Sequence, residues 1–185
     1  VAISAFVIAS TSGAVAREIE RGTVLMLLAA PVARWRFLAA KVGALLVGII
    51  VLAVSALAGT WLGVALTGVE GVSMATFALI QVTTVAFAFS IGGIGLLVSS
   101  VTSDGGQAMG ITTAIVVAMF FVDFLSLLWA PAEFLGPLAV FHYYDPLGVS
   151  VADALPVSDV LVLFAVGLVG TAAAFVAFMR RDITH

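Results

Sequence analysis

The stretch "VGALLVGIIVLAVSALAGTWLGVAL" covers residues 42–66 and contains no charged side chain. An α-helix needs about 20 consecutive apolar residues to cross the hydrocarbon core of a bilayer, so this run is long enough to span a membrane. The rest of the chain has the same character. Apolar residues make up 63% of it and charged residues 9%, against about 25% charged residues in an ordinary soluble domain. The sequence therefore predicts a helical membrane domain.

Three further runs reach the length of a spanning helix. They cover residues 74–98, 107–129 and 160–179. The chain also begins inside an apolar run, residues 1–16, which we interpret as the end of another spanning helix that starts earlier. We therefore expect a single all-α, polytopic membrane helix bundle with five crossings in this sequence.

The basic residues predict the orientation of these crossings. Cytoplasmic loops of membrane proteins carry an excess of Lys and Arg. Five crossings put residues 17–37, the turn-rich loop 99–106 with Asp104 and the tail 180–185 on one side. All the basic residues belong to that side: Arg17, Arg21, Arg34, Arg36, Lys41, Arg180 and Arg181. We therefore expect a multi-pass protein of the cell membrane whose charged segment and C-terminal tail are cytoplasmic.

Residues 130–159 form a long connection on the opposite side, with four prolines and many aromatic residues. We interpret them as short re-entrant helices that dip into the outer leaflet, with Tyr and Trp at the headgroup level. Within them, His142 and Asp145 flank Tyr143 and Tyr144. Two potential ligands do not complete a metal shell, so we interpret this group as an interfacial plug whose polar side chains satisfy one another.

Two features inside the spans also suggest specific contacts. An acid within a span, here Asp123, is costly; it faces a polar pathway, pairs across a dimer, or approaches the outer interface. Small residues let membrane helices approach closely. They occur as the pairs Gly59/Gly63 and Gly106/Gly110 and as the cluster "SIGGIG" at residues 90–95. We expect ordinary helix packing at these glycines, and a gating or dimer role is the alternative.

The segment "AREIERGTVLMLLAAPVARWRF", residues 16–37, concentrates charge around a short apolar block. Gly22 permits a sharp bend, and Thr23 is a suitable N-cap for a new helix. Residues 24–30 give about two helical turns, and Pro31 ends them. The sequence predicts an elbow on the cytoplasmic face. Its short helix either lies in the headgroup layer or docks into a groove of a cytoplasmic protein, with Glu18, Glu20 and Arg21 making polar contacts.

Residues 17–41, "REIERGTVLMLLAAPVARWRFLAAK", resemble the segment shared by type-2 permeases of ATP-binding cassette (ABC) transporters. The matching residues are Glu20, Arg21, Gly22, Thr23, Leu27, Leu28, Pro31, Arg34 and Lys41. The ending "FMRRDITH" and the long outer segment before the last span are also similar to the family. Such permeases typically have six spans, of which the first one and a half do not appear in this sequence.

The resemblance implies an exporter in which the elbow is the coupling helix, seated on a separate ATP-binding subunit. Its contacts would come from Glu18, Glu20, Arg21, Gly22, Thr23, Leu27, Leu28 and Pro31. It also implies a second permease copy, identical or related, and an outer gate or pathway near Asp123, His142, Tyr143, Tyr144 and Asp145. The partners expected are these proteins and the lipid bilayer, and no nucleic acid.

The chain itself is not expected to be an enzyme. It has no G-x-x-x-x-G-K-[ST] sequence that could cradle phosphates, so ATP and Mg²⁺ belong to the partner and no cofactor is expected here. Without cysteine, it can form neither a disulfide nor a Cys-based metal site. The alternative is a secondary transporter or channel without an ATPase, although that class usually has ionisable or broken-helix features near the bilayer centre. A third class, an intramembrane enzyme, has little support, because the sequence shows neither a nucleophile–base pair nor a metal cluster.

Overall fold

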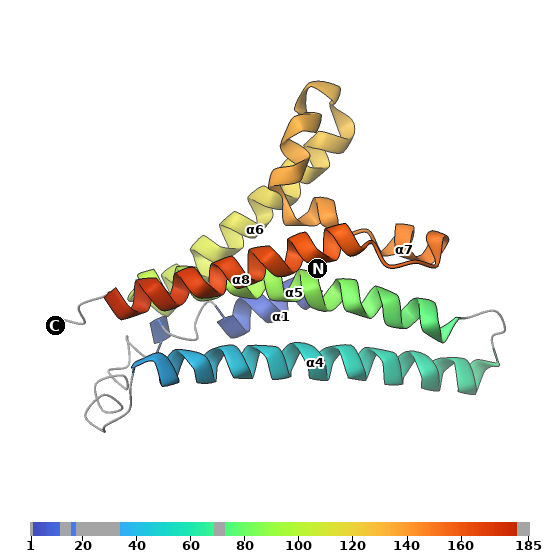
Figure 1. Ribbon diagram of the computed structural model, residues 1–185, viewed down its shortest axis with the longest axis horizontal. Coiled ribbons are helices and arrows are strands. Elements are labelled where there is room, and N and C mark those ends of the chain that lie inside the picture. Colours follow the sequence, from blue (N-terminus) through green and yellow to red (C-terminus); the bar gives the residue numbers. More distant parts are fainter. Residues whose placement is uncertain (1, 12–15, 18–33, 69–72, 181–185) are drawn as a thin grey trace.

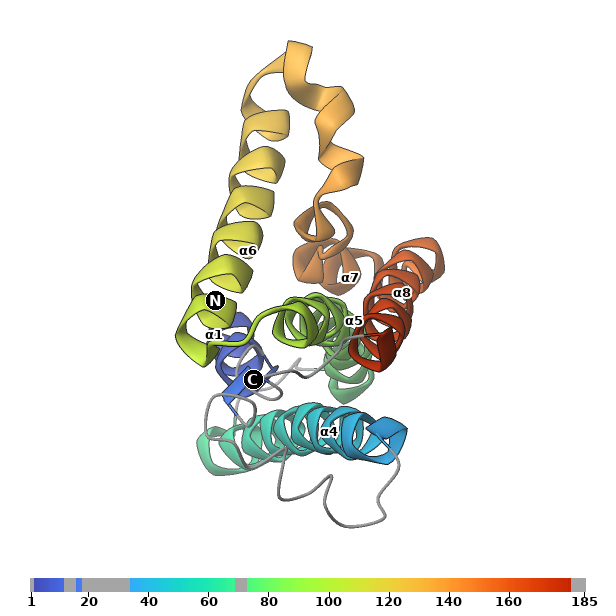
Figure 2. The ribbon, with the colours of Figure 1, turned by 90° about the vertical axis from the view of Figure 1, so that its left-hand side faces the viewer.

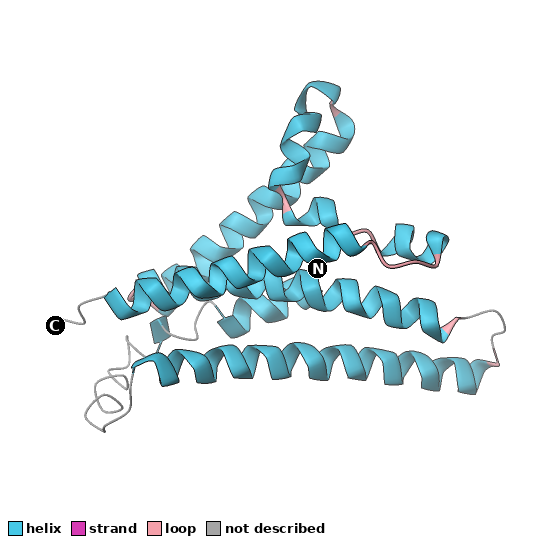
Figure 3. Cartoon of the chain, in the orientation of Figure 1, coloured by secondary structure: helices cyan, strands magenta, loops and turns pink. Residues whose placement is uncertain are grey.

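The computed structural model describes residues 2–11, 16–17, 34–68 and 73–180. All regular secondary structure in these parts is helical, which confirms the predicted all-α class (Figure 1, Figure 3). In chain order the elements are α1 (Ala2–Thr11), α4 (Arg34–Thr67), α5 (Met74–Val101), α6 (Gly105–Leu128), the 3₁₀ helices η1 (Ala130–Leu138) and η2 (Val140–Tyr143), α7 (Pro146–Ala152) and α8 (Val157–Arg180).

Four of the described helices, α4, α5, α6 and α8, are long and apolar enough to cross a membrane. They contain three of the four full-length runs that the sequence indicates, and α6 ends one residue before the end of the fourth run, residues 107–129. Helix α1 has ten residues, too few to cross the hydrocarbon core alone. The fifth crossing therefore stays a prediction.

Helix α5 lies at the centre of the bundle, with α4, α6 and α8 around it (Figure 2). Most of α5 is buried, whereas the other three spans expose most of their apolar surface. Its mean hydropathy of 1.9 is nonetheless the lowest of the four. Buried hydroxyls explain the difference, because those of Thr84 and Ser100 each donate to a carbonyl one turn earlier, at 2.8 Å. A helix surrounded by protein tolerates such groups better than one that faces lipid.

Helices α5 and α8 approach so closely that their backbones touch. A Cβ atom added to Gly170 would lie 2.7 Å from the carbonyl carbon of Gly93, and one added to Gly93 would lie 3.0 Å from the Cα of Gly167. Only glycine fits this crossing, since each missing side chain makes room for the opposite backbone. The close packing predicted for the "SIGGIG" cluster is thus confirmed, with a partner surface on α8.

The other small-residue pairs do not form such crossings in the described chain. No atom lies within 4 Å of a Cβ built on Gly59, Gly63 or Gly110. These glycines lie on the outward sides of α4 and α6. Helix packing was therefore the wrong prediction for them within this chain, because the small-xxx-small spacing marks one face of a helix and does not say what covers it.

Two helix boundaries differ from the sequence prediction. Helix α4 begins at Arg34, so the basic and aromatic residues that precede the apolar run are already helical. The turn-rich loop predicted over residues 99–106 shrinks to residues 102–104. Helix α5 continues to Val101, and α6 starts at Gly105, where the Asp104 carboxylate caps it by accepting a hydrogen bond from the Gln107 N–H at 2.8 Å.

The connection 130–159 folds into short helices, as predicted. Helix η1 doubles back along the end of α6, and both extend away from α5 and α8 (Figure 1). The chain then returns through η2 to α7, which packs on α5. A hydrogen bond from the Thr76 hydroxyl to the Asp153 carboxylate joins the start of α5 to the end of α7. The depth of these helices in a bilayer remains a prediction.

Candidate functional site

The residues predicted to couple to an ATPase lie outside the described part of the chain. They are Glu18, Glu20, Arg21, Gly22, Thr23, Leu27, Leu28 and Pro31. The bend at residue 22, the cap and the short docking helix therefore remain predictions. The structure does describe both flanks of this segment, residues 16–17 before it and α4 after it.

The leading flank is held against the turn between α5 and α6. Ala16 is fully buried, and its backbone N–H donates to the Ser99 hydroxyl at 3.1 Å. The side chain of Arg17 lies on Gly105, the first residue of α6, so closely that an added Cβ there would overlap the Arg17 side chain. We call these four residues the stem joint. It connects the start of the predicted elbow directly to the start of α6.

The trailing flank carries alternating basic and aromatic residues at the start of α4. The Arg36 guanidinium lies 5.5 Å from the centre of the Trp35 ring, and the Lys41 ammonium 5.3 Å from that of Phe37. Phe37 also stacks on Phe178 of α8, with 5.9 Å between the ring centres. Cation–π contacts of this kind suit the boundary between lipid and water. The elbow thus ends on a helix start that is anchored to the last span.

At the other end of the bundle, Asp123 of α6 faces His142 of η2. The Asp123 Oδ1 atom is 3.8 Å from the His142 Nδ1 atom, and the two side chains are 16% and 43% exposed. Gly136 of η1 packs beside them, since a Cβ there would come within 3.0 Å of the Ser126 hydroxyl and 3.1 Å of His142 Nδ1. The lone acid of the spans therefore has a partner within the same chain, at the point where α6, η1 and η2 meet.

Aromatic rings attach η2 to the bundle beside this pair. The Tyr144 ring stacks on Phe87 of α5, with ring centres 4.4 Å apart, and its hydroxyl lies 3.3 Å from that of Thr84. Phe141 contacts Phe87 at 5.1 Å and Phe120 of α6 at 5.5 Å. We call Phe87, Phe120, Phe141 and Tyr144 the aromatic cluster. Because its rings come from α5, α6 and the segment 130–159, the cluster connects the middle of α5 to α6 through η2.

The remaining predicted gate residues have local roles. The Tyr143 hydroxyl donates to the Pro137 carbonyl at 3.1 Å. Asp145 caps α7, because its carboxylate accepts a hydrogen bond from the Gly148 N–H at 2.9 Å. The interpretation that His142 and Asp145 satisfy each other is therefore wrong. The two residues are three positions apart, but η2 ends between them and the chain turns into α7. Each side chain therefore has a different partner.

Sequence reasoning missed several residues of the stem joint and of the aromatic cluster. Ser99 and Gly105 had been assigned to a loop, and Phe87 and Phe120 are ordinary apolar residues of a span. Nothing local to these positions indicates a contact with a distant segment. Among the described residues, no group of three or more His, Cys, Asp and Glu side chains could hold a metal ion.

Comparison with protein families gives a match over nearly the whole sequence. Residues 1–183 match the model of a family described as "ABC-2 family transporter protein". Searches among curated proteins and among solved structures gave no match.

Proposed function

The chain belongs to the ABC-2 transporter family, and from this premise we propose that it is the membrane-spanning permease subunit of an ATP-driven exporter. Family membership implies an ATP-binding partner and embedding in a membrane. The four long apolar helices agree with embedding in a membrane. The energy would come from ATP and Mg²⁺ on the partner, because the phosphate-binding sequence G-x-x-x-x-G-K-[ST] does not occur here.

The observation that best supports this function is the stem joint. Residues 17–37 would form the coupling elbow that sits on the ATP-binding subunit. The buried hydrogen bond from Ala16 to Ser99 and the contact of Arg17 with Gly105 lie where the elbow begins. A displacement of the elbow would therefore act directly on the first turn of α6.

Helix α6 is also the span best placed to move. It is the least buried of the four, whereas α5 and α8 are locked by their glycine crossing. Motion of packed helices about a rigid body is a common route for switching access. We propose that α6 moves against the α5–α8 pair, and that η1 and η2 follow it as an outer gate.

A second permease copy would complete the pathway. Helices α4 and α6 expose large apolar side chains along their length, among them Trp61, Phe121 and Leu128. Lipid covers part of such a surface, and a partner copy would cover another part. In this arrangement the elbow and the C-terminal tail face the cytoplasm, as the basic residues predict.

The elbow can be tested by substitution in the complete permease assembled with its ATP-binding partner. We expect Glu20→Gln and Gly22→Val to reduce ATP-dependent transport at least tenfold while membrane insertion stays intact. A lost buried polar contact or a blocked bend costs on the order of 1.4 kcal/mol or more, which corresponds to a factor of ten. Transport into inverted vesicles and the amount of inserted protein are the two measurements.

Matched controls are available outside the elbow. Glu133 of η1 is exposed, and a Cβ on Gly43 of α4 would meet no atom of the described residues within 4 Å, so Glu133→Gln and Gly43→Val should transport normally. Full transport by both elbow variants would refute the coupling assignment.

A further inference from the structure

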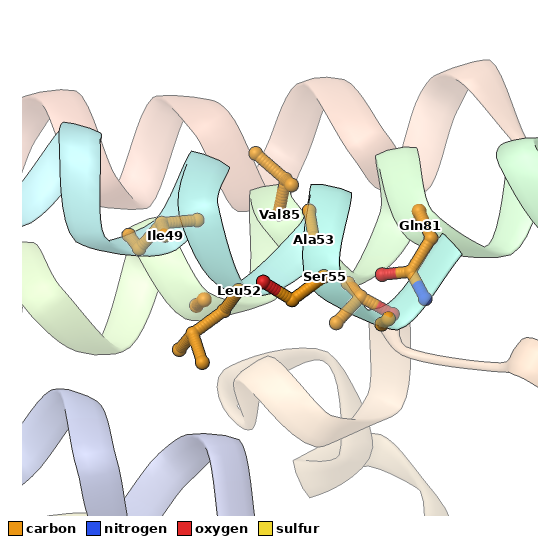
Figure 4. Close-up of a pocket in the computed structure, with 9 residues that line it drawn as sticks. Ile49, Leu52, Ala53, Ser55, Gln81 and Val85 are labelled. Atoms are coloured by element: carbon orange, nitrogen blue, oxygen red, sulfur yellow. The ribbon is translucent and has the colours of Figure 1, made fainter. Parts of the chain in front are cut away.

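A cavity of about 350 Å³ lies between α4 and α5 (Figure 4). Its volume lies within the range of small-molecule sites, roughly 300–1,000 Å³. Ile49 lies at one end and Gln81 at the other (Figure 4). The floor is closed by buried residues such as Ala88, while Ser55 on the rim is exposed.

The cavity follows from the side chains that line it. Three of the residues that line it are alanines, Ala53 and Ala56 of α4 and Ala88 of α5. Alanine side chains are too short to fill the space between two helices. There is also no glycine at this place that would let the backbones close up, as they do between α5 and α8. The result is a slot that the side chains of the described residues leave open.

One end of the slot is polar. Gln81, a partly buried residue, brings a carboxamide into it (Figure 4), and Ser55 and Thr84 are also among the lining residues. Within the described part of the chain, no hydrogen bond to the Gln81 side chain is found. An amide in hydrocarbon is costly unless something bonds to it.

The polar and the apolar end of the slot would lie at different depths in the membrane. Helix α5 has 28 residues and is about 42 Å long, more than the roughly 30 Å of hydrocarbon that it crosses. If the helix is centred, Ala88 lies at the midplane and Gln81 about 10 Å from it. The amide is then about 5 Å inside the edge of the hydrocarbon, and the opposite, apolar end of the slot reaches the centre.

From this change in polarity along the slot, we propose that it binds one glycerophospholipid of the bilayer. An acyl chain would lie along Ile49 and Ala88, and the Gln81 amide would donate a hydrogen bond to the ester carbonyl. Phospholipids have a carbonyl at the start of an apolar chain, the order in which the slot offers its amide and its apolar walls. The site would lie in the leaflet at the amino-terminal end of α5, the outer one in the predicted orientation.

The test uses the complete permease with its ATP-binding partner in phosphatidylcholine vesicles. A minor fraction of the lipid carries a photoactivatable diazirine in its acyl chain, in either an ester-linked or an ether-linked form. After irradiation, labelled peptides are quantified by mass spectrometry. We expect the ester lipid to label residues 49–56 and 81–88 about threefold more than the ether lipid, the factor expected for one hydrogen bond in a membrane.

Two variants and their controls separate the contribution of the Gln81 amide from that of the open space in the slot. Gln81→Leu should lower labelling by the ester lipid about threefold and remove its advantage over the ether lipid, while Gln107→Leu on α6 should change neither. Ala56→Phe should fill the slot and abolish labelling there, whereas Val54→Phe, at an exposed position of the same helix, should not.

Three results would overturn the proposal. The first is equal labelling by ester and ether lipids in the unchanged protein. The second is an unchanged pattern in Gln81→Leu. The third is the absence of lipid labelling at the slot, which would show that a protein segment fills it. Because Gln81→Leu only removes a polar group, it remains informative if Ala56→Phe fails to fold.

Discussion

The glycine crossing between α5 and α8 leads to a quantitative prediction for Gly170→Ala. The new Cβ would lie 2.7 Å from the Gly93 carbonyl carbon, 2.9 Å from its oxygen and 3.1 Å from the Ile94 nitrogen. All three are backbone atoms, so none can rotate away. The closest contact must lengthen to at least 3.4 Å, the start of ordinary van der Waals contact, and this separates the two helices locally by about 0.7 Å.

A gap of this size removes about a quarter to a half of the dispersion attraction between facing atoms. Overpacking of a tight interior costs about 1–3 kcal/mol, and the higher helix propensity of Ala offsets up to about 1 kcal/mol. We therefore expect Gly170→Ala to lower the free energy of unfolding by about 1–2 kcal/mol. Titration of the detergent-solubilised protein with SDS, followed by circular dichroism, measures this quantity.

Gly63→Ala on α4 is the matched control, because no atom lies within 4 Å of its new Cβ. It should leave stability unchanged or raise it slightly. The double variant Gly93→Ala/Gly170→Ala should lose less than the sum of the single changes, since helices already pushed apart accommodate the second methyl group more easily. The reasoning would be refuted if Gly170→Ala left the free energy of unfolding unchanged, or if Gly63→Ala lowered it by the same amount.

Three further predictions concern the ends of the spans. A double-mutant cycle of Asp123→Asn and His142→Gln should give a coupling of about 0.6 kcal/mol, the average for polar contacts between membrane helices; zero coupling would mean that the two side chains do not stabilise each other. Ser99→Ala leaves the buried N–H at the stem joint without its acceptor, so we expect a several-fold loss of transport with less effect on ATP hydrolysis; equal losses of both would contradict a role in transmission. Ser103→Cys should react with a thiol reagent from the cytoplasm and Ser150→Cys from outside; the reverse pattern would overturn the orientation.

Much of the candidate site could be recognised from local sequence features. The charged block 17–37 and its Gly, Thr and Pro residues carried the family resemblance, and the match over residues 1–183 agrees with it. Asp123 stood out because an acid in a span is costly. Its partner could not be predicted, since His142 is 19 positions away and lies on a 3₁₀ helix whose path depends on how η1 folds back along α6.

The sequence by itself determined the class of the protein and the extent of its long helices. Uncharged runs such as residues 42–66 have one stable form in lipid, because a helix satisfies every backbone hydrogen bond internally. Only the tertiary structure decided which helix lies at the centre and which glycines are contacts. All four spans are apolar, so hydropathy does not say which faces meet, and lipid supplies no hydrophobic drive that would mark them. Gly93 and Gly170 became a crossing while Gly59 and Gly63 stayed open, because close approach depends on the shapes of both helices at once.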